Sequence, residues 1–439
     1  MSETALYKPE DLRPMLMASL TVCWVAAAGL VWLSSPWSAV SLIILGTIAL
    51  IAQLPLKTVV LAFVFILPFD LQRRVGGHWV YLDLLVAAVA LPLFRNRKWP
   101  PRLCWLLVPF FLYFLITGFP RSLLPAWLSE YAVRWVIGFC FSAAVALSGV
   151  AEDLALATGV TLVPLTTYAL YQLSVGNFGT LYTWMNPQMD DRAWIGRSYS
   201  LMWHPNHFGE FAAMVSVMLI AIGIKGYKST LSFSLAAVGI VGLLCSGSRG
   251  SETGAGIVIL LLLIQTPKYW RKLAMIALAV LIIWGAQHYD FIPLERAEQL
   301  DDFTVESRLL IWGAAYTGWQ KSPWIGLGTA NFREVMPNFV NSDAVHAHSI
   351  YLQILAETGL IGFTLFFGPL LYLLWRAWKD RMVPVVLAGA CALSVWFVHG
   401  FVDISFMDQP PSLLLLFLVI GLIVGGLRSQ NTLRLADLS

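Results

Sequence analysis

Charged residues are scarce in this chain of 439 residues. Lysine, arginine, aspartate and glutamate together make up 12% of it, whereas hydrophobic residues make up 58%. Soluble domains carry about 25% charged residues, so this composition excludes a soluble globular protein. The net charge of +3, with no basic run and no nucleic-acid-binding motif, also argues against a nucleic-acid partner.

Cysteine and targeting signals are sparse as well. Five cysteines occur, an odd number without Cys-x-x-Cys spacing, so we expect buried thiols and neither disulfides nor metal ligands. Residues 1–14 are polar and the first apolar segment is long enough to stay in a membrane, so we expect no cleavable signal peptide. The cysteines are Cys23, Cys104, Cys140, Cys245 and Cys391.

Long apolar segments fill most of the chain. A helix needs about 20 apolar residues to cross the hydrocarbon, and the sequence predicts fourteen spans. Two of them, 56–69 and 253–266, are short enough to be half-spans, so twelve spans is the alternative. The predicted spans are 15–33, 36–54, 56–69, 79–94, 103–118, 131–149, 154–173, 206–224, 231–246, 253–266, 273–288, 349–375, 383–399 and 412–427.

The basic residues orient these spans. They gather in short loops and after the last span, and all five groups fall on one side if the spans alternate. Because lysine and arginine mark cytoplasmic loops, both termini are predicted to be cytoplasmic, with the longer loops on the opposite face. The groups are Arg95, Arg97, Lys98 and Arg102; Lys225 and Lys228; Lys268, Arg271 and Lys272; Arg376, Lys379 and Arg381; and Arg428 and Arg434.

The sequence therefore predicts an all-α integral membrane protein, a polytopic bundle of 12–14 transmembrane helices with one large outer loop. Residues 1–288 form an N-terminal transmembrane bundle, and 289–348 form the loop that carries the chemistry. Residues 349–439 form the C-terminal transmembrane helices and a short cytoplasmic tail. No fixed-period repeat occurs, which argues against a solenoid.

The stretch 303–362 is polar, and a membrane protein that keeps such a stretch outside lipid uses it for chemistry or recognition. Ser307-Arg308 with Trp312 predicts the start of an amphipathic segment. The run Ser322-Pro-Trp-Ile-Gly-Leu-Gly328 predicts a tight Gly/Pro turn.

His348 is the predicted catalytic residue. It follows His346 and precedes Ser349 where the loop enters a span, and histidine is the commonest general base near neutral pH. Gly359 and Gly362 would allow close helix packing and so fix His348 in place. The alternative is a histidine that only caps an interfacial helix.

Arginines are the second group of candidate site residues. Arg249 interrupts two apolar spans within a Gly-Ser-Arg-Gly-Ser break, and Arg197 precedes the span that begins near residue 206. Together with Arg308 they could present permanently charged forks to a diphosphate, with Lys321 as a weaker candidate. The alternative for Arg249 is a side chain that snorkels to the interface.

The remaining candidates are acidic and metal-ligating residues. Asp403 could orient His348, pair with an arginine or cap a loop. Asp301-Asp302, His204-x-x-His207 and His346-x-His348 have tolerable metal spacing, but each lacks a complete ligand set, so no metal and no cofactor is predicted.

Taken together, these elements resemble the O-antigen ligase family of membrane glycosyltransferases. The matching residues are His348-Ser349 with Gly359 and Gly362, Ser307-Arg308 with Trp312, Pro323 with Gly326 and Gly328, Ser248-Arg249-Gly250, and Arg197 ahead of Pro205-Asn206.

The resemblance implies a GT-C-like enzyme of the bacterial inner membrane with its active site facing the periplasm. It implies transfer of a glycan from undecaprenyl diphosphate to a sugar hydroxyl of lipid A–core, without a metal and with inversion. His348 would then be the base, with Arg249, Arg308 and Arg197 on the diphosphate.

Other readings remain. An O-antigen polymerase or a protein O-oligosaccharyltransferase would use the same donor. One dominant outer loop, with only a modest second loop at 174–205, and little chain after the last span mildly favour the ligase. A transporter or flippase is the alternative of another class, because Arg134 and Asp83 lie inside predicted spans. A transport assay in vesicles without acceptor lipid would separate these classes.

Overall fold

The structure is a computed structural model. It describes residues 54–68, 73–75, 78–80, 101–121, 125–175, 196–202, 204–266, 305–329, 331–332, 346–404 and 410–436. These residues form α3 (Leu56–Ile66), β1 (Arg73–Val75), β2 (His78–Val80), the 3-10 helix η1 (Arg102–Trp105), α5 (Val108–Gly118), α6 (Pro125–Leu147), α7 (Ala151–Val175), α9 (Pro205–Ile224), α10 (Ser229–Ser246), α11 (Arg249–Gln265), α13 (Val305–Lys321), α15 (Ile350–Lys379), α16 (Pro384–His399) and α18 (Pro410–Ala436).

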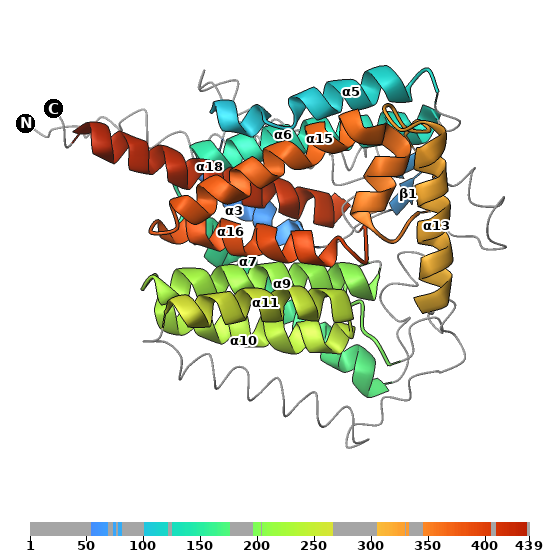
Figure 1. Cartoon of the computed structure of the whole chain (residues 1–439). Helices are drawn as coiled ribbons and strands as arrows, with labels where there is room; N and C mark the ends of the chain where they lie inside the picture. The colour runs from blue at the N-terminus through green and yellow to red at the C-terminus, as the bar shows by residue number, and fades with distance from the viewer. Residues whose placement is uncertain are drawn as a thin grey trace, which may run out of the picture.

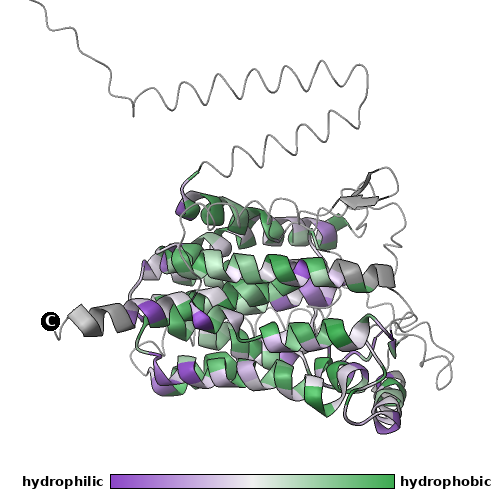
Figure 2. Ribbon diagram, turned by 90° about the horizontal axis from the view of Figure 1, so that it is seen from above, coloured by the Kyte–Doolittle hydropathy of each residue, from purple (hydrophilic) through white to green (hydrophobic). Residues whose placement is uncertain are grey.

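The predicted all-α architecture of a multi-pass membrane protein is confirmed, with most helices stacked side by side in one bundle (Figure 1). Within the described residues, five helices are long and apolar enough to cross a membrane: α7, α9, α10, α15 and most of α18. The one departure is an antiparallel pairing of β1 with β2 in a loop. Figure 2 shows apolar residues along most of the stacked helices and polar residues mostly near their ends.

Ten of the predicted spans coincide with described helices. The other four, 15–33, 36–54, 79–94 and 273–288, lie wholly or largely outside the described residues, although 79–94 begins within β2. Helix α3 has 11 residues, which at 1.5 Å per residue gives about 16 Å, half of the hydrocarbon thickness. Its length therefore fits the half-span interpretation.

Helix α9 is the centre of the bundle. Every side chain in its apolar window is buried, and it packs against α7, α10, α11 and α16. Small residues permit this close approach: a side chain at Gly209 would meet Ser246 and Ser248 at the end of α10. Helices α16 and α18 pack on α9 and α6, so the predicted N- and C-terminal membrane segments share one core.

Successive helices run in alternating directions, so each loop lies at one of the two ends of the bundle. At one end Ser198 N–H donates to the Cys245 carbonyl, and Ile350 N–H donates to the Gly400 carbonyl. At the other end Lys228 pairs with Asp153 at 3.0 Å. The described basic groups gather at this second end, as the loop charges predicted. They include Lys225, Lys228, Arg376, Lys379, Arg381 and Arg428.

Helix α13 crosses the first end of the bundle instead of running along it (Figure 1). The predicted segment at Ser307-Arg308 is therefore helical, but its two faces are less distinct than expected. Ile311 and Ala315 are buried, while Leu309 and Leu310 are exposed. An apolar outer surface suits a helix that lies at the boundary between lipid and water.

Candidate functional site

His348 occupies the turn that leads into α15. Its φ angle is +46°, a left-handed conformation that few residues other than glycine adopt. The chain is tied on both sides of it: Ala347 N–H donates to Gln353 Oε1 at 2.7 Å, and Ile350 N–H donates to the Gly400 carbonyl at 2.9 Å. Such strain persists where surrounding contacts enforce it, typically at functional sites.

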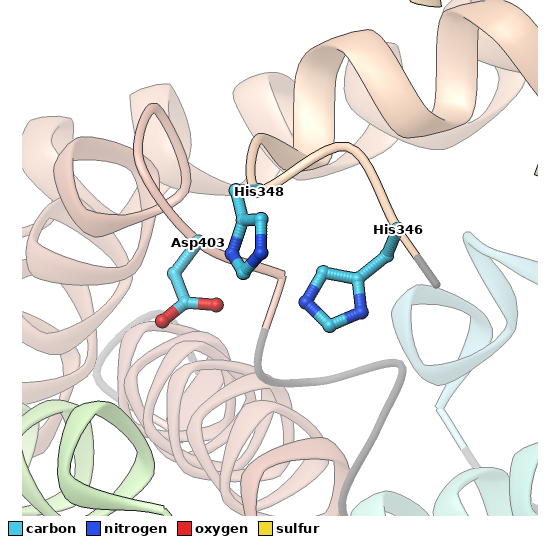
Figure 3. Close-up of side chains that lie close together, drawn as sticks. All are labelled: His346, His348 and Asp403. Carbon is cyan, nitrogen blue, oxygen red and sulfur yellow. The ribbon is translucent and has the colours of Figure 1, made fainter. Parts of the chain in front are cut away.

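Two further side chains meet His348. One donor atom each from His346, His348 and Asp403 lies within 4.8 Å of the others, and the two imidazole centroids are 4.4 Å apart. Figure 3 shows the His348 ring between the Asp403 carboxylate and the His346 ring. Asp403 follows α16, so the helix packing joins segments that are distant in sequence.

Burial sets the charge of this cluster. It lowers the pKa of His348 to about 4, with His346 and Arg308 acting in the same direction and Asp403 opposing them. Burial also lowers the pKa of His346. Burial alone would raise the pKa of Asp403, but the surrounding histidines outweigh it and hold that pKa below its usual range. At neutral pH the cluster is two neutral imidazoles beside a carboxylate.

Asn206 holds the carboxylate from α9. Its Nδ2 donates to Asp403 Oδ2 at 2.6 Å, while Ile404 N–H donates to Oδ1 at 2.7 Å. Arg197 supports Asn206 in turn: the guanidinium donates to Asn206 Oδ1 at 2.6 Å and to the Ser246 carbonyl at 3.0 Å. The structure therefore places Arg197 behind Asp403, in a network that links α9 and α10 to the cluster.

Sequence reasoning missed the buried pair of Glu210 and His399. Glu210 Oε1 lies 3.5 Å from His399 Nδ1, and His399 Nε2 lies 3.9 Å from Asp403 Oδ2. Both members of the pair are buried. The available signal was Glu210 itself, a lone acidic residue inside an apolar span, where ionisable residues are usually functional.

The remaining predicted cations lie at different distances from the cluster. Arg249 is exposed and begins α11, whose next residue, Gly250, faces His399: a β-carbon there would lie 3.1 Å from His399 Cδ2. Arg308 is half-buried in the first turns of α13. Lys321 ends the same 17-residue helix, about 20 Å from Arg308 along the axis, so the structure does not bring it to the cluster.

Within the part of the chain that the structure describes, two N–H groups on one side of α13 lack acceptors. Among the residues that the structure describes, neither Arg308 Nε nor Trp312 Nε1 has a hydrogen-bond partner, and both atoms are buried. Leaving such a donor unsatisfied costs about 1–3 kcal/mol, more for a charged group. An anionic oxygen at this place would remove that penalty.

Gly359 interrupts α15 with φ of 63° and ψ of −170°, and the predicted Gly/Pro turn docks into the break. Side chains at Gly359 or Gly326 would clash with the backbone of the other segment. The sequence predicted that Gly359 serves helix packing, whereas it serves backbone docking that ties α13 to α15. The four main-chain bonds are Leu327 N–H to Ala356, Gly328 N–H to Glu357, Leu360 N–H to Pro323 and Ile361 N–H to Trp324.

Ser349 is the residue before the first turn of α15. Its side chain is buried and makes no capping hydrogen bond. It therefore contributes to the site through the backbone that it shares with His348.

Comparison with known proteins gives one family. The family model described as O-antigen ligase matches residues 233–367, a segment that contains Arg249, Arg308, His348 and Gly359. No curated protein matches the chain. The family indicates ligase- or polymerase-type glycosyl transfer in a membrane protein. This segment of the chain is therefore similar to the O-antigen ligase family.

Proposed function

We propose that the protein transfers a glycan from undecaprenyl diphosphate to a sugar hydroxyl of lipid A–core. The reaction takes place at the periplasmic face of the bacterial inner membrane, without a metal and with inversion at the anomeric carbon. The observation that carries the proposal is the neutral His348 imidazole, held beside the Asp403 carboxylate at the bundle end where Arg249 and Arg308 also lie.

His348 is the general base. The acceptor hydroxyl oxygen forms a bond to the anomeric carbon while an imidazole nitrogen takes the hydroxyl proton. The bond from the anomeric carbon to the diphosphate oxygen breaks, and undecaprenyl diphosphate leaves with the electron pair. Asp403 stabilises the imidazolium that forms, and the membrane confines both lipid substrates to one face, which promotes their encounter.

Binding of the donor raises the pKa of the His348 imidazole. A pKa of about 4 for His348 is too low for an efficient base near neutral pH. A diphosphate bound beside Arg308 offsets the field of that arginine and adds negative charge near the imidazole, and both effects raise the pKa. Proton abstraction therefore becomes favourable only once the donor has bound.

Arg249 and Arg308 bind the diphosphate. Arg249 stands at the N-terminus of α11, where the helix dipole and the first-turn N–H groups favour an anion. Arg308 offers an Nε–H group without an acceptor among the described residues, and Trp312 offers a second donor on the same side. These groups stabilise the charge that develops on the leaving diphosphate.

The test compares three proteins purified in detergent, with undecaprenyl-diphosphate glycan, lipid A–core and EDTA present. The native chain should form product, and His348→Ala should lose about 10²- to 10⁴-fold in turnover. Tyr372→Phe, an exposed change on α15, serves as the control for purification and should retain turnover.

The other outcomes identify what is wrong. Equal product from the native chain and His348→Ala would remove His348 as the base. If the native chain forms product only without EDTA, metal independence is wrong. If lipid A–core accepts nothing but a second lipid-linked glycan does, the enzyme is a polymerase. If a protein serine or threonine accepts the glycan instead, it is an oligosaccharyltransferase.

A further inference from the structure

Five of the chain's seven histidines surround Asp403. Judged from spacing alone, neither histidine pair had a complete ligand set. The fold supplies the missing ligand, because Asp403 from the loop after α16 lies against His346 and His348. The five are His204, His207, His346, His348 and His399.

We propose that His346, His348 and Asp403 form a binding site for a divalent transition-metal ion such as Zn²⁺, and that the bound ion inhibits the transferase. The inhibitory half rests on the proposed role of His348 as the base. The metal is therefore not a cofactor of the reaction but a competitor for the imidazole nitrogen that would receive the proton.

The donor set is suited to such an ion. Two imidazoles and one carboxylate are a common set for zinc when a fourth position is left for water. Donors on a tetrahedral zinc lie about 3.3–3.5 Å apart, so donors that now lie within 4.8 Å need side-chain shifts of about 1 Å. Figure 3 shows the three side chains converging on one region from two separate segments.

The second shell of the site is already formed. Metal-bound carboxylates are usually held by outer hydrogen bonds, and here Asn206 Nδ2 donates to Asp403 Oδ2 at 2.6 Å. The other carboxylate oxygen, Oδ1, accepts from Ile404 N–H. The carboxylate is therefore fixed before an ion arrives.

Neighbouring histidines are poorer ligands. His204 Nδ1 accepts a hydrogen bond from Asn206 N–H at 3.0 Å, so a neutral His204 carries its proton on Nε2 and presents no lone pair there. His399 faces Glu210 across 3.5 Å. Of the four described cysteines, Cys104, Cys245 and Cys391 are buried among apolar residues of the core, and Cys140 is half-buried.

Inhibition follows from the shared lone pair. An imidazole nitrogen that binds Zn²⁺ cannot accept the proton of the acceptor hydroxyl. The ion and the acceptor therefore compete, and a chelator reverses the effect. The donor has its own contacts at Arg249 and Arg308, so donor binding should survive.

The binding experiment uses the full chain in detergent, treated with EDTA, freed of the chelator and titrated with Co²⁺. We expect one ion per chain with visible d–d absorption, no thiolate charge-transfer band, and displacement by Zn²⁺. His346→Ala and Asp403→Asn should lose the spectrum, and Asn206→Ala should weaken affinity by about 10- to 100-fold. His204→Gln is the matched control and should keep the spectrum.

Thermal unfolding of each metal-free variant checks that it is folded, and only folded variants are scored. No stoichiometric Co²⁺ binding by the native chain overturns the site. A spectrum that survives His346→Ala but disappears in His204→Gln overturns the ligand set. Because this readout needs no turnover, it stands even if the proposed transferase reaction is wrong.

The activity experiment compares turnover with Zn²⁺ to turnover with EDTA for each protein. For the native chain, turnover with Zn²⁺ should be well below turnover with EDTA, and adding EDTA to the inhibited enzyme should restore it. For His346→Ala the ratio should stay near one, whatever its own turnover. Zn²⁺ bound at the site without loss of native turnover overturns the inhibitory half, while absence of product under every condition contradicts the proposed function instead.

Discussion

Asn206 is the residue on which the site geometry depends. It accepts a hydrogen bond from Arg197, donates to Asp403, and gives its backbone N–H to His204. Arg197 is therefore engaged by the protein in this structure. Its expected role changes from binding the donor to positioning Asp403, and the two roles differ in kinetics.

Asn206→Leu and Arg197→Lys test this difference. Each removes a bond behind Asp403, so we expect turnover to fall by about 10- to 100-fold at an unchanged KM for the donor. Unfolding in detergent should become easier by about 1–3 kcal/mol, because buried partners are left unsatisfied. A raised KM for the donor with unchanged turnover would instead show that Arg197 binds the diphosphate.

Arg308 and Lys321 provide a matched pair on one helix. Arg308 influences the pKa of His348, whereas Lys321 lies at the far end of α13. Arg308→Ala should therefore reduce turnover by about 10²-fold or more, and Lys321→Ala should have a much smaller effect. The measurement is the initial rate of each variant over a range of donor concentrations. An equal loss of turnover in the two variants would contradict the proposal that Arg308, and not Lys321, binds the diphosphate.

The break in α15 is the element that joins α13 to the turn that carries His348. Because Gly359 and Gly326 each face the backbone of the opposing segment, the turn after α13 can dock only while both positions lack side chains. Arg308 and His348 are thus held in register through the main chain.

Gly359→Ala and Gly326→Ala should each destabilise the protein by more than about 2 kcal/mol, through positive-φ strain and the backbone clash. Gly313→Ala is the control: a β-carbon at that position of α13 meets open space, so stability should stay the same or rise by about 0.5–1 kcal/mol. Thermal unfolding in detergent measures all three. Native stability of Gly359→Ala would show that the docking is dispensable.

At the scale of the whole molecule, the two ends of the bundle should face different compartments. Phe401 is exposed at the end that carries the site, and Met382 is exposed at the end that carries the basic residues. A membrane-impermeant maleimide added to intact spheroplasts should label Phe401→Cys, and should label Met382→Cys only after permeabilisation. The reverse pattern would invert the predicted topology.

The sequence predicted those features that depend on local composition. Apolar length located ten of the described helices, and loop charge sorted their ends. The residue types of His348, Arg249 and Arg308 indicated the chemistry that we propose for the site. It could not predict that Asn206 and Glu210 support the site, because their partners Asp403 and His399 lie on a distant part of the chain. It also misjudged Gly359, since a helix break that receives another backbone leaves no periodic signal.

The Glu210–His399 pair has a consequence for how the protein is made. Glu210 sits on α9, the most enclosed helix of the bundle, while His399 ends α16, which is synthesised much later. During translation this carboxyl therefore enters the bilayer before its partner exists. Nascent chains cut short before α16 should leave α9 poorly retained in the membrane, and the bundle should become protease-resistant only once α16 has inserted.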